Sequence, residues 1–199
     1  MIPSLPLSRA LDQETNNVLL LDGGKVICFL NRAWTESAER EHLPATCRAE
    51  ALLGRRFLDF VAGGLKPYLA QAFERAATMG PGIHSVWLHG ECNTPQLFRR
   101  LTTRISPIWD PRQAEPTAYL IHNDVRRVGA LSDRYVLAEI PIDTWVQNDG
   151  LIVQCGCCRR VRNPKTSEWA MSIELLEHPV EHTSHGLCEL CLETYYGES

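Results

Sequence analysis

Apolar residues in this chain form several short runs and one longer periodic stretch. Residues 18–21 and 26–30 are apolar, and the turn sequence DGGK at 22–25 separates them, which predicts a β-hairpin. Across 65–76, apolar side chains recur at intervals of three and four residues, which predicts an amphipathic helix with one buried stripe. The sequence GPG at 80–82 ends this helix.

Three further strands are expected after this helix. Residues 83–89, 96–105 and 117–125 are rich in β-branched and aromatic residues, and the segments between them are rich in turn formers. A shorter helix is expected at 33–41. Strands and helices that do not alternate strictly indicate an α+β fold, here an antiparallel five-stranded sheet with flanking helices.

The C-terminal quarter of the chain contains the clearest candidate chemistry. Two C-x-x-C pairs, Cys155 with Cys158 and Cys188 with Cys191, are separated by residues 159–187. Four thiolates in this pattern suit a closed tetrahedral site, which zinc prefers. A segment as small as 151–199 has little core of its own, and a structural zinc, worth on the order of 10–16 kcal/mol in small peptides, stabilises such modules.

Other interpretations of these cysteines stay open at this stage. The pairs could form disulfides, or hold iron in an iron–sulfur or redox site. Cys157 could replace Cys158 as a ligand, and His182 or His185 could substitute for a cysteine or support one from outside. A simple turn residue is the alternative interpretation of His185, because it precedes Gly186.

Residues 17–128 resemble a PAS domain. The segment DGGKVICFLNRAW at 22–34 is similar to the opening motif of that family, and LGRRFLD at 53–59 is similar to the step before its long helix. IHNDV at 121–125 lies where the last strand of that family often ends in a DIT-like tripeptide. Here Val125 and Arg126 stand in place of its isoleucine and threonine. The resemblance implies a PAS-like sensor domain with a pocket between sheet and helices. Residues 1–16, which are rich in proline and then polar, are expected to be a leader, with a short helix at 8–13 as the alternative.

That pocket has seven candidate lining residues, each of which could equally fill the core: Trp34, Phe57, Tyr68, Phe73, Trp87, Leu120 and His122. Haem would need an axial ligand, for which the candidates are His84, His89 and His122. A flavin photosensor would need a specific cysteine motif, and Cys47 followed by Arg48 lacks its context. Haem and flavin therefore have no specific support.

Residues 151–199 resemble the cysteine-rich tail that follows PAS domains in some bacterial signalling proteins. The shared features are the first cysteine pair with its basic residues, a central Trp169, and the sequence SHGLCELC at 184–191 followed by Tyr195 and Tyr196. The resemblance implies a small zinc-ribbon or treble-clef-like module. Residues 129–150, which Pro141 interrupts, are expected to be a connector.

Composition and charge limit the function. Hydrophobic residues make up 44% and charged residues 22%, as in soluble globular proteins. The net charge of −4 argues against a dedicated nucleic-acid-binding protein, because such proteins usually carry an excess of basic residues. Apolar runs are too short to cross a membrane, and the reduced cysteines and poor signal sequence favour a cytoplasmic protein. Catalytic motifs are missing and a four-cysteine site is closed to substrate, so we expect no enzyme.

These observations predict a stand-alone signalling or sensory protein. It would act through a protein partner or as a homodimer, with a small ligand in the PAS pocket as a candidate gate, and Tyr195 and Tyr196 as a candidate contact surface. The alternative is a transcriptional or nucleic-acid-associated regulator. It would bind through the basic residues beside the first cysteine pair, which are Arg159, Arg160, Arg162 and Lys165.

Overall fold

The computed structural model describes residues 4–43, 45–61, 65–94, 96–135, 137–138, 141–178, 180 and 182–196. The break expected at Gly63 and Gly64 lies outside them. The chain divides into two compact units. Unit 1 comprises Met1–Val61, Lys66–Leu88 and Thr102–Asp124, and unit 2 comprises Ala62–Leu65, His89–Leu101 and Val125–Ser199. Within the described ranges, each helix is too short or too polar to traverse a lipid bilayer.

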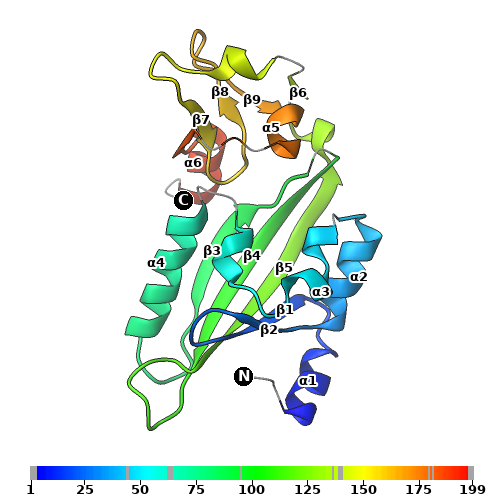
Figure 1. Cartoon of the computed structure of the whole chain (residues 1–199), viewed down its shortest axis with the longest axis vertical. Helices are drawn as coiled ribbons and strands as arrows, with labels where there is room; N and C mark the ends of the chain where they lie inside the picture. The colour runs from blue at the N-terminus through cyan, green and yellow to red at the C-terminus, as the bar shows by residue number, and fades with distance from the viewer. Residues whose placement is uncertain are drawn as a thin grey trace. The chain divides into compact units, whose positions relative to one another are not determined.

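A five-stranded sheet, with strand order β2-β1-β5-β4-β3, is the centre of unit 1 (Figure 1). Its strand β1 pairs antiparallel with both β2 and β5. The strands are β1 (Asn17–Asp22), β2 (Ile27–Leu30), β3 (Val86–Glu91), β4 (Leu97–Ile108) and β5 (Ala118–Ala130). This antiparallel sheet with flanking helices confirms the expected α+β fold and has the arrangement of a PAS domain.

Helices precede, connect and flank these strands. The α-helices are α1 (Leu5–Leu11), α2 (Arg32–Arg40), α3 (Ala49–Leu52) and α4 (Leu65–Thr78), and two short 3-10 helices lie at Ala45–Cys47 and Phe57–Phe60. The predicted apolar stripe of α4 is buried, because Ala72, Phe73 and Ala76 all join the core of unit 1. Residues 5–11, expected to belong to a leader, form α1, whose Leu11 is buried.

The hairpin turn at 22–25 forms as its sequence predicts. The side chain of Asp22 accepts a hydrogen bond from the backbone N–H of Val26 at 3.0 Å, and Lys25 adopts the left-handed conformation. A side chain at Gly23 would come within 3.0 Å of the carbonyl oxygen of Pro116. Glycine at this position therefore allows the hairpin to approach the loop between β4 and β5 closely.

A single buried asparagine joins three parts of unit 1. The side-chain oxygen of Asn31 accepts from the backbone N–H of Val18 at 2.9 Å and caps α2 by accepting from Trp34 at 3.2 Å. Its amide group donates to the carbonyl oxygens of Leu11 and Asn16. This residue, found in the family-like motif at 22–34, thus fixes the ends of α1, β1 and α2.

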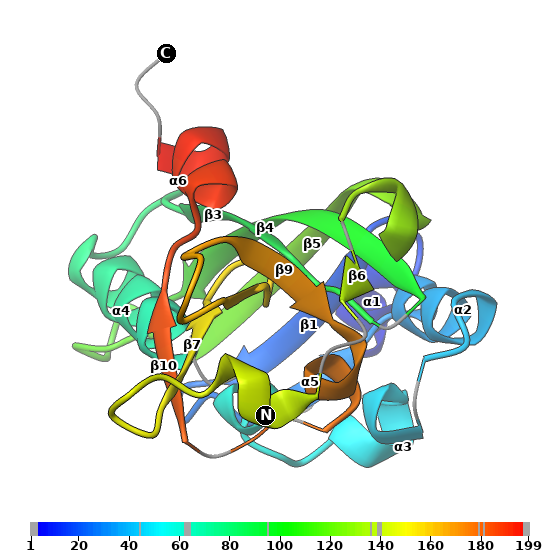
Figure 2. The same cartoon turned by 90° about the horizontal axis from the view of Figure 1, so that it is seen from above.

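A second five-stranded sheet, with strand order β10-β7-β8-β9-β6, organises unit 2; Figure 2 labels β10, β7, β9 and β6. The elements are β6 (Leu137–Ala138), β7 (Ile152–Cys155), β8 (Val161–Arg162), β9 (Trp169–Ser172), α5 (Ile173–Glu177), β10 (Thr183–Gly186) and α6 (Glu189–Tyr196). Two 3-10 helices lie at Leu131–Asp133 and Ile142–Trp145.

Residues 129–150 differ from the connector that we expected. Strand β6 pairs in parallel with β9, so this segment contributes a strand to the second sheet. Leu131, Tyr135 and Trp145 are buried in the two hydrophobic clusters of unit 2. The proline and glycine residues that suggested a linker shape short turns inside a packed unit, because the apolar residues between them find a core.

Candidate metal centre

The first cysteine pair lies on a tight turn between β7 and β8. Cys155 ends β7, and its backbone N–H donates to the carbonyl oxygen of Arg160 at 2.7 Å, while the N–H of Arg159 donates back to Cys155 at 2.9 Å. Arg159 has a left-handed backbone, which lets the chain reverse within a few residues. This knuckle places the side chains of Cys155 and Cys158 on the same side of the turn.

The second pair is brought to the first by parallel strand pairing. Strand β10 pairs with β7, with Gly186 opposite Cys155, and the carbonyl oxygen of Gly186 accepts from the N–H of Gly156 at 2.9 Å. Two residues later the backbone N–H of Cys188 lies 3.5 Å from Sγ of Cys155. Cys191 follows in the first turn of α6. The short parallel pairing of β10 with β7 thus brings together two cysteine pairs that lie far apart in the sequence.

The four cysteines form a buried cluster of ligand atoms. Sγ atoms of Cys155, Cys158, Cys188 and Cys191 all lie within 4.8 Å of one another, and each residue is 0% exposed. The sulfur atoms of Cys158 and Cys188 are 3.7 Å apart, and a tetrahedral site with Zn–S bonds of about 2.3 Å requires separations of about 3.8 Å. These residues therefore fit a four-thiolate metal site with small shifts of the sulfur atoms.

Hydrogen bonds among the thiols set their acidity. The pKa of Cys155 lies far below its ordinary value because Cys157, Cys158 and other thiols donate to it. Donation to Cys155 in turn raises the pKa of Cys157 to about 12. Cys157 is buried beside the cluster but does not belong to the group of four mutually close sulfurs. The spacing of the C-x-x-C motif and the mutual distances of the sulfur atoms thus select Cys158 over Cys157 as the candidate ligand.

The histidines considered as substitutes are not part of the described cluster. His185 lies on β10 and is exposed, and the carbonyl oxygen of His182 accepts from the N–H of Ile152 at 3.0 Å. Both residues support the strand that delivers Cys188. The side chains of Tyr195 and Tyr196, expected to form a contact surface, lie outside the described residues.

Two arginines of the knuckle are engaged inside unit 2. Arg160 Nη2 donates to Sγ of Cys188 at 2.7 Å, and Arg159 Nη2 donates to the carbonyl oxygens of Leu175 and Leu176 in α5. Burial lowers the pKa of Arg160, but the neighbouring Cys158 and Cys188 more than offset this and raise it above its ordinary value. Arg159 thus contacts a helix and Arg160 the cysteine cluster, and both contacts lie inside unit 2.

A buried polar network lies next to the knuckle, and sequence reasoning missed it. The carboxylate of Glu91, on β3, accepts hydrogen bonds from Arg134 Nε at 2.9 Å and from the hydroxyl of Tyr135, and it forms an ion pair with the Arg134 guanidinium at 2.7 Å. Asn93 Nδ2 donates to this carboxylate at 3.3 Å and to the carbonyl oxygen of Cys158 at 2.8 Å. The spacing of these residues in sequence gives no signal, since they are joined only when the end of β3 meets the knuckle within unit 2.

Four of the seven candidate pocket residues lie together in unit 1. Phe73 is in the buried core and makes edge-to-face contacts with Phe57 and with Tyr119. Trp34, Phe57 and Tyr68 pack against this core. They pack against one another and against other apolar and aromatic side chains of unit 1, as expected of residues that fill a core, and Trp34 Nε1 also donates to the carbonyl oxygen of Cys47 at 3.1 Å.

The other three candidates are placed differently. Tyr119 and Ile121 of β5 point into the core, so Leu120 and His122 between and after them face the other side of the sheet. Trp87 is 56% exposed between the buried Val86 and Leu88. The structure thus separates Trp87, Leu120 and His122 from the core residues of the expected pocket, because strand alternation turns them outward.

None of the three haem-ligand candidates has a buried, free nitrogen in a cavity. Arg104 Nη2 donates to Nδ1 of His122 at 3.1 Å, and burial followed by the charge of Arg104 lowers the pKa of His122. His84 and His89 are exposed. These positions give the haem hypothesis no structural support.

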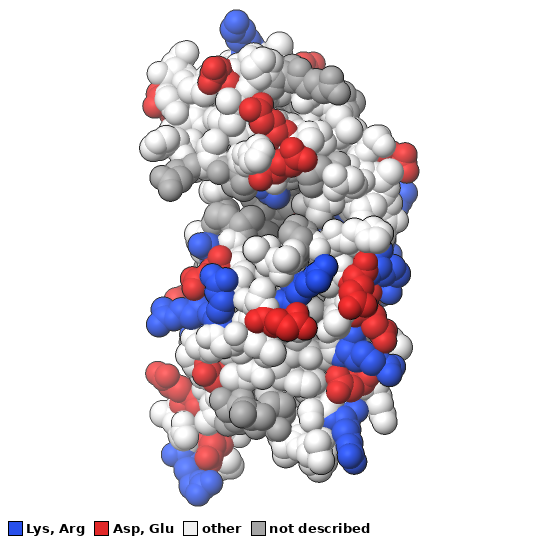
Figure 3. Space-filling model, turned by 45° about the vertical axis from the view of Figure 1, so that its right-hand side comes forward, with Lys and Arg blue, Asp and Glu red and all other residues white. Residues whose placement is uncertain are grey.

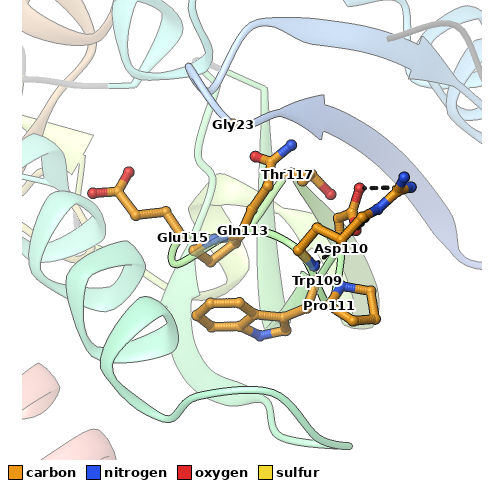
Figure 4. Close-up of a pocket in the computed structure, with 9 residues that line it drawn as sticks. Gly23, Trp109, Asp110, Pro111, Gln113, Glu115 and Thr117 are labelled. Carbon is orange, nitrogen blue, oxygen red and sulfur yellow. Dashed lines mark hydrogen bonds and ion pairs between the residues drawn. The ribbon is translucent and has the colours of Figure 1, made fainter.

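A surface pocket of about 730 Å³ lies at another place in unit 1 (Figure 4). It is formed by the loop between β4 and β5 and by Gly23 of the hairpin turn. The ring of Trp109 and the side chains of Gln113 and Glu115 line it, and Asp110 forms an ion pair with Arg112 at its rim. None of the seven candidate residues lines this pocket. Its loop carries only turn signals in sequence, which do not reveal a hollow.

Charged side chains on one face of the molecule are mixed in sign. Figure 3 shows lysine and arginine side chains interspersed with aspartate and glutamate over the face in view. This face therefore offers no continuous basic surface, and electrostatic attraction of a phosphate backbone depends on such a surface.

Comparisons with known proteins show structural similarity without a matching family. No family model matches the chain, and no curated protein matches its sequence. Among solved structures, VqmA bound to DPO is 15% identical with a TM-score of 0.45, over 62% of this chain and 58% of that one. The match therefore spans less than two thirds of VqmA. A further VqmA structure, from Vibrio cholerae, is described as a complex with a ligand and DNA.

Two sensor proteins give similar matches. The PAS domain of BvgS from Bordetella pertussis is 16% identical with a TM-score of 0.40, over 61% of this chain and 84% of that one. The photoactive yellow protein domain of the sensor histidine kinase Ppr from Rhodospirillum centenum is 20% identical with a TM-score of 0.43, over 59% and 91%. The PAS-type description of this chain rests on its own strand order, β2-β1-β5-β4-β3, and the helices that flank that sheet.

Proposed function

We propose that this chain is a sensory or signalling protein in which a PAS-type unit is joined to a unit held together by structural zinc. The observation that carries the proposal is the buried four-cysteine cluster, whose sulfur atoms lie within 4.8 Å of one another. Four protein ligands complete a tetrahedral zinc site, so no coordination position remains for a substrate. The site supports a role in stability and shape, and catalysis is not part of the proposal.

Each residue of the cluster has a defined task. Cys155 and Cys158 hold the metal from the knuckle, and Cys188 and Cys191 hold it from the start of α6. When bound, zinc supplies a cross-link between β7 and α6 and favours the deprotonated form of the four thiols. Cys157 donates to Cys155 from outside the ligand set, which supports the charge on that sulfur.

Signalling is proposed to proceed through contact with a protein partner or with a second copy of the chain. Proteins that share one fold have many different functions, so the strand order by itself does not identify an activity. As the binding site of a small regulatory ligand we propose the surface pocket at Trp109. The residues expected to line a pocket in the core pack against one another instead. Partner, ligand and cytoplasmic location belong to the proposal.

Regulation through nucleic acid is the second candidate, and we do not favour it. Arg159 and Arg160, on which that hypothesis depended, donate to carbonyl oxygens and to a cysteine sulfur within unit 2. Arg162 and Lys165 are exposed, but two cations give a weak phosphate contact. A VqmA structure is described as a complex with DNA, so DNA binding by this chain is included in the experiment below.

The decisive experiment combines metal analysis with binding assays on the purified chain. We expect about one zinc per chain, an absorbance spectrum without haem or flavin bands, and no DNA mobility shift at low salt. Disulfides without metal would contradict the zinc assignment. A shift whose affinity falls steeply with salt would favour the nucleic-acid regulator. Light scattering of the same sample measures whether the chain self-associates.

A further inference from the structure

The proposed zinc centre carries a charge that the interior of unit 2 has to compensate. Four thiolates around one divalent cation leave two negative charges, and all four cysteines are fully buried. Charges removed from water are costly unless hydrogen bonds or opposite charges lie beside them. A cation close to a ligand sulfur therefore bears directly on how tightly the metal is held.

Arg160 is placed to supply this compensation. Its Nη2 atom lies 2.7 Å from Sγ of Cys188, a short distance for a hydrogen bond to sulfur. Its backbone carbonyl oxygen accepts from the N–H of Cys155 at 2.7 Å, so the same residue contacts one ligand from each pair. Arg159, its neighbour, points elsewhere and caps the carbonyl oxygens of α5. The two adjacent arginines thus have separate tasks.

Arg160 is itself held by the buried polar network at the end of β3. Its guanidinium lies 5.3 Å from the ring centre of Tyr135, and such stacking favours a cation over an aromatic face. The hydroxyl of Tyr135 donates to Glu91, and Arg134 pairs with the same carboxylate at 2.7 Å. Glu91 and Tyr135 are only 4% and 5% exposed. Both the ring and the carboxylate are therefore fixed in position by packing.

The same network holds the knuckle at a second point. Asn93 Nδ2 bridges the carboxylate of Glu91 and the carbonyl oxygen of Cys158. One contact thus reaches a ligand sulfur through Arg160, and another reaches the backbone of a ligand through Asn93. Residues from the end of β3 and from 134–135 surround the cluster from outside, although they lie far from the cysteines in sequence.

We propose that Arg160 is a positioning residue of the metal centre, and that Glu91, Asn93 and Tyr135 position it and the knuckle so that metal retention depends on them. The proposal rests on the zinc function proposed above. Its physical content is that the guanidinium stabilises the charge on Cys188, while the network prevents the guanidinium from turning towards water. Partners of this kind outside the ligand set typically change metal affinity by about 10- to 100-fold.

The test compares zinc release in excess chelator from the wild-type full chain and from four variants of it. Arg160→Gln removes the charge, Arg160→Lys keeps a charge but not the planar fork, and Tyr135→Phe keeps the ring but removes the hydroxyl. Arg162→Gln is the matched control, since it neutralises an exposed arginine two residues further along, in strand β8. We expect roughly 10- to 100-fold weaker zinc binding in Arg160→Gln, a smaller loss in the Lys and Phe variants, and no change in the control.

Cobalt substitution separates an electronic role from a general loss of stability. A hydrogen bond withdraws electron density from a thiolate, so its removal should shift the sulfur-to-cobalt charge-transfer band to longer wavelength in Arg160→Gln and not in Arg162→Gln. If Arg160→Gln keeps the wild-type release rate and spectrum, the proposal is overturned while the zinc site stands. If the wild-type chain binds no metal, the zinc function itself fails, so the two failures are distinguishable.

Discussion

The two units fill their interiors with different chemistry. The core of unit 1 consists of aliphatic and aromatic side chains, with Phe73 at its centre. The main cluster of unit 2 contains five buried cysteines beside a few larger apolar residues such as Phe98 and Met171. Burial of apolar surface can stabilise unit 1 without any ligand. Unit 2 gathers thiols that repel one another when deprotonated, so under the zinc proposal its stability is expected to depend on a bound ion.

The largest expected effect comes from breaking the cysteine cluster. Cys188→Ser should abolish zinc binding and unfold unit 2, because it removes a ligand from a site worth on the order of 10–16 kcal/mol in small zinc peptides. Unit 1 should keep its fold. Metal content by mass spectrometry and hydrogen exchange resolved by segment measure both outcomes. Cys92→Ser, which changes an exposed cysteine, should retain the metal; equal loss in both variants would contradict the assignment.

The converse change acts on the core of unit 1. Phe73 is fully buried between Phe57 and Tyr119, and Phe73→Ala should cost about 3–5 kcal/mol through lost burial and the cavity left behind. Chemical denaturation followed by fluorescence measures this cost. Zinc content should stay near wild type. A variant that loses its metal together with its stability would show that the two units do not fold independently.

A smaller effect is expected from replacing Asn31, the buried asparagine that joins three parts of unit 1. Asn31→Ala removes the acceptor of the Val18 N–H and the cap of α2, and leaves the carbonyl oxygen of Leu11 without its donor. Stranding buried backbone groups costs about 1–3 kcal/mol. Asn31→Asp keeps the acceptor and loses the donor, so it should be intermediate when the same denaturation curves are compared. Stability equal to wild type in Asn31→Ala would contradict the role assigned to this residue.

The smallest effect is a pH dependence confined to unit 1. Burial and the nearby Arg104 lower the pKa of His122 below its ordinary value of 6.5, so the folded state binds a proton less readily than the unfolded state. The stability of unit 1 should therefore be complete above pH 6.5 and decline as the pH falls below it. Thermal unfolding between pH 7.5 and 5.5 measures the slope. His122→Gln should flatten it, whereas His84→Gln, at an exposed position, should not.

Local patterns in the sequence predicted the local structure well. The DGGK turn predicted the hairpin correctly, because the Asp22 side chain binds the turn backbone and Lys25 adopts the left-handed conformation of a tight turn. The apolar stripe at 65–76 predicted α4 correctly. The cysteine spacing identified four residues that do gather in space. In each case, the residues that carry the signal are also those that make the contact.

Long-range contacts were beyond the sequence. The strand predicted at 96–105 continues in the structure to Ile108, beyond Pro107, because a proline close to a strand end removes little hydrogen bonding. Residues 90–95 looked like a turn, but Glu91 ends β3 and joins Arg134 and Tyr135 in a buried network. Such partners are brought together by tertiary packing, and periodicity in a single segment contains no information about them.

The parallel pairing of β10 with β7 also has a consequence for the order in which the protein is made. Cys191 follows Glu91 at a distance that a ribosome covers in roughly 5–20 s at about 5–20 residues per second. Until then the cysteine cluster lacks Cys188 and Cys191, which are half of its sulfur atoms. All of unit 1 is therefore synthesised before the residues that complete the cysteine cluster of unit 2.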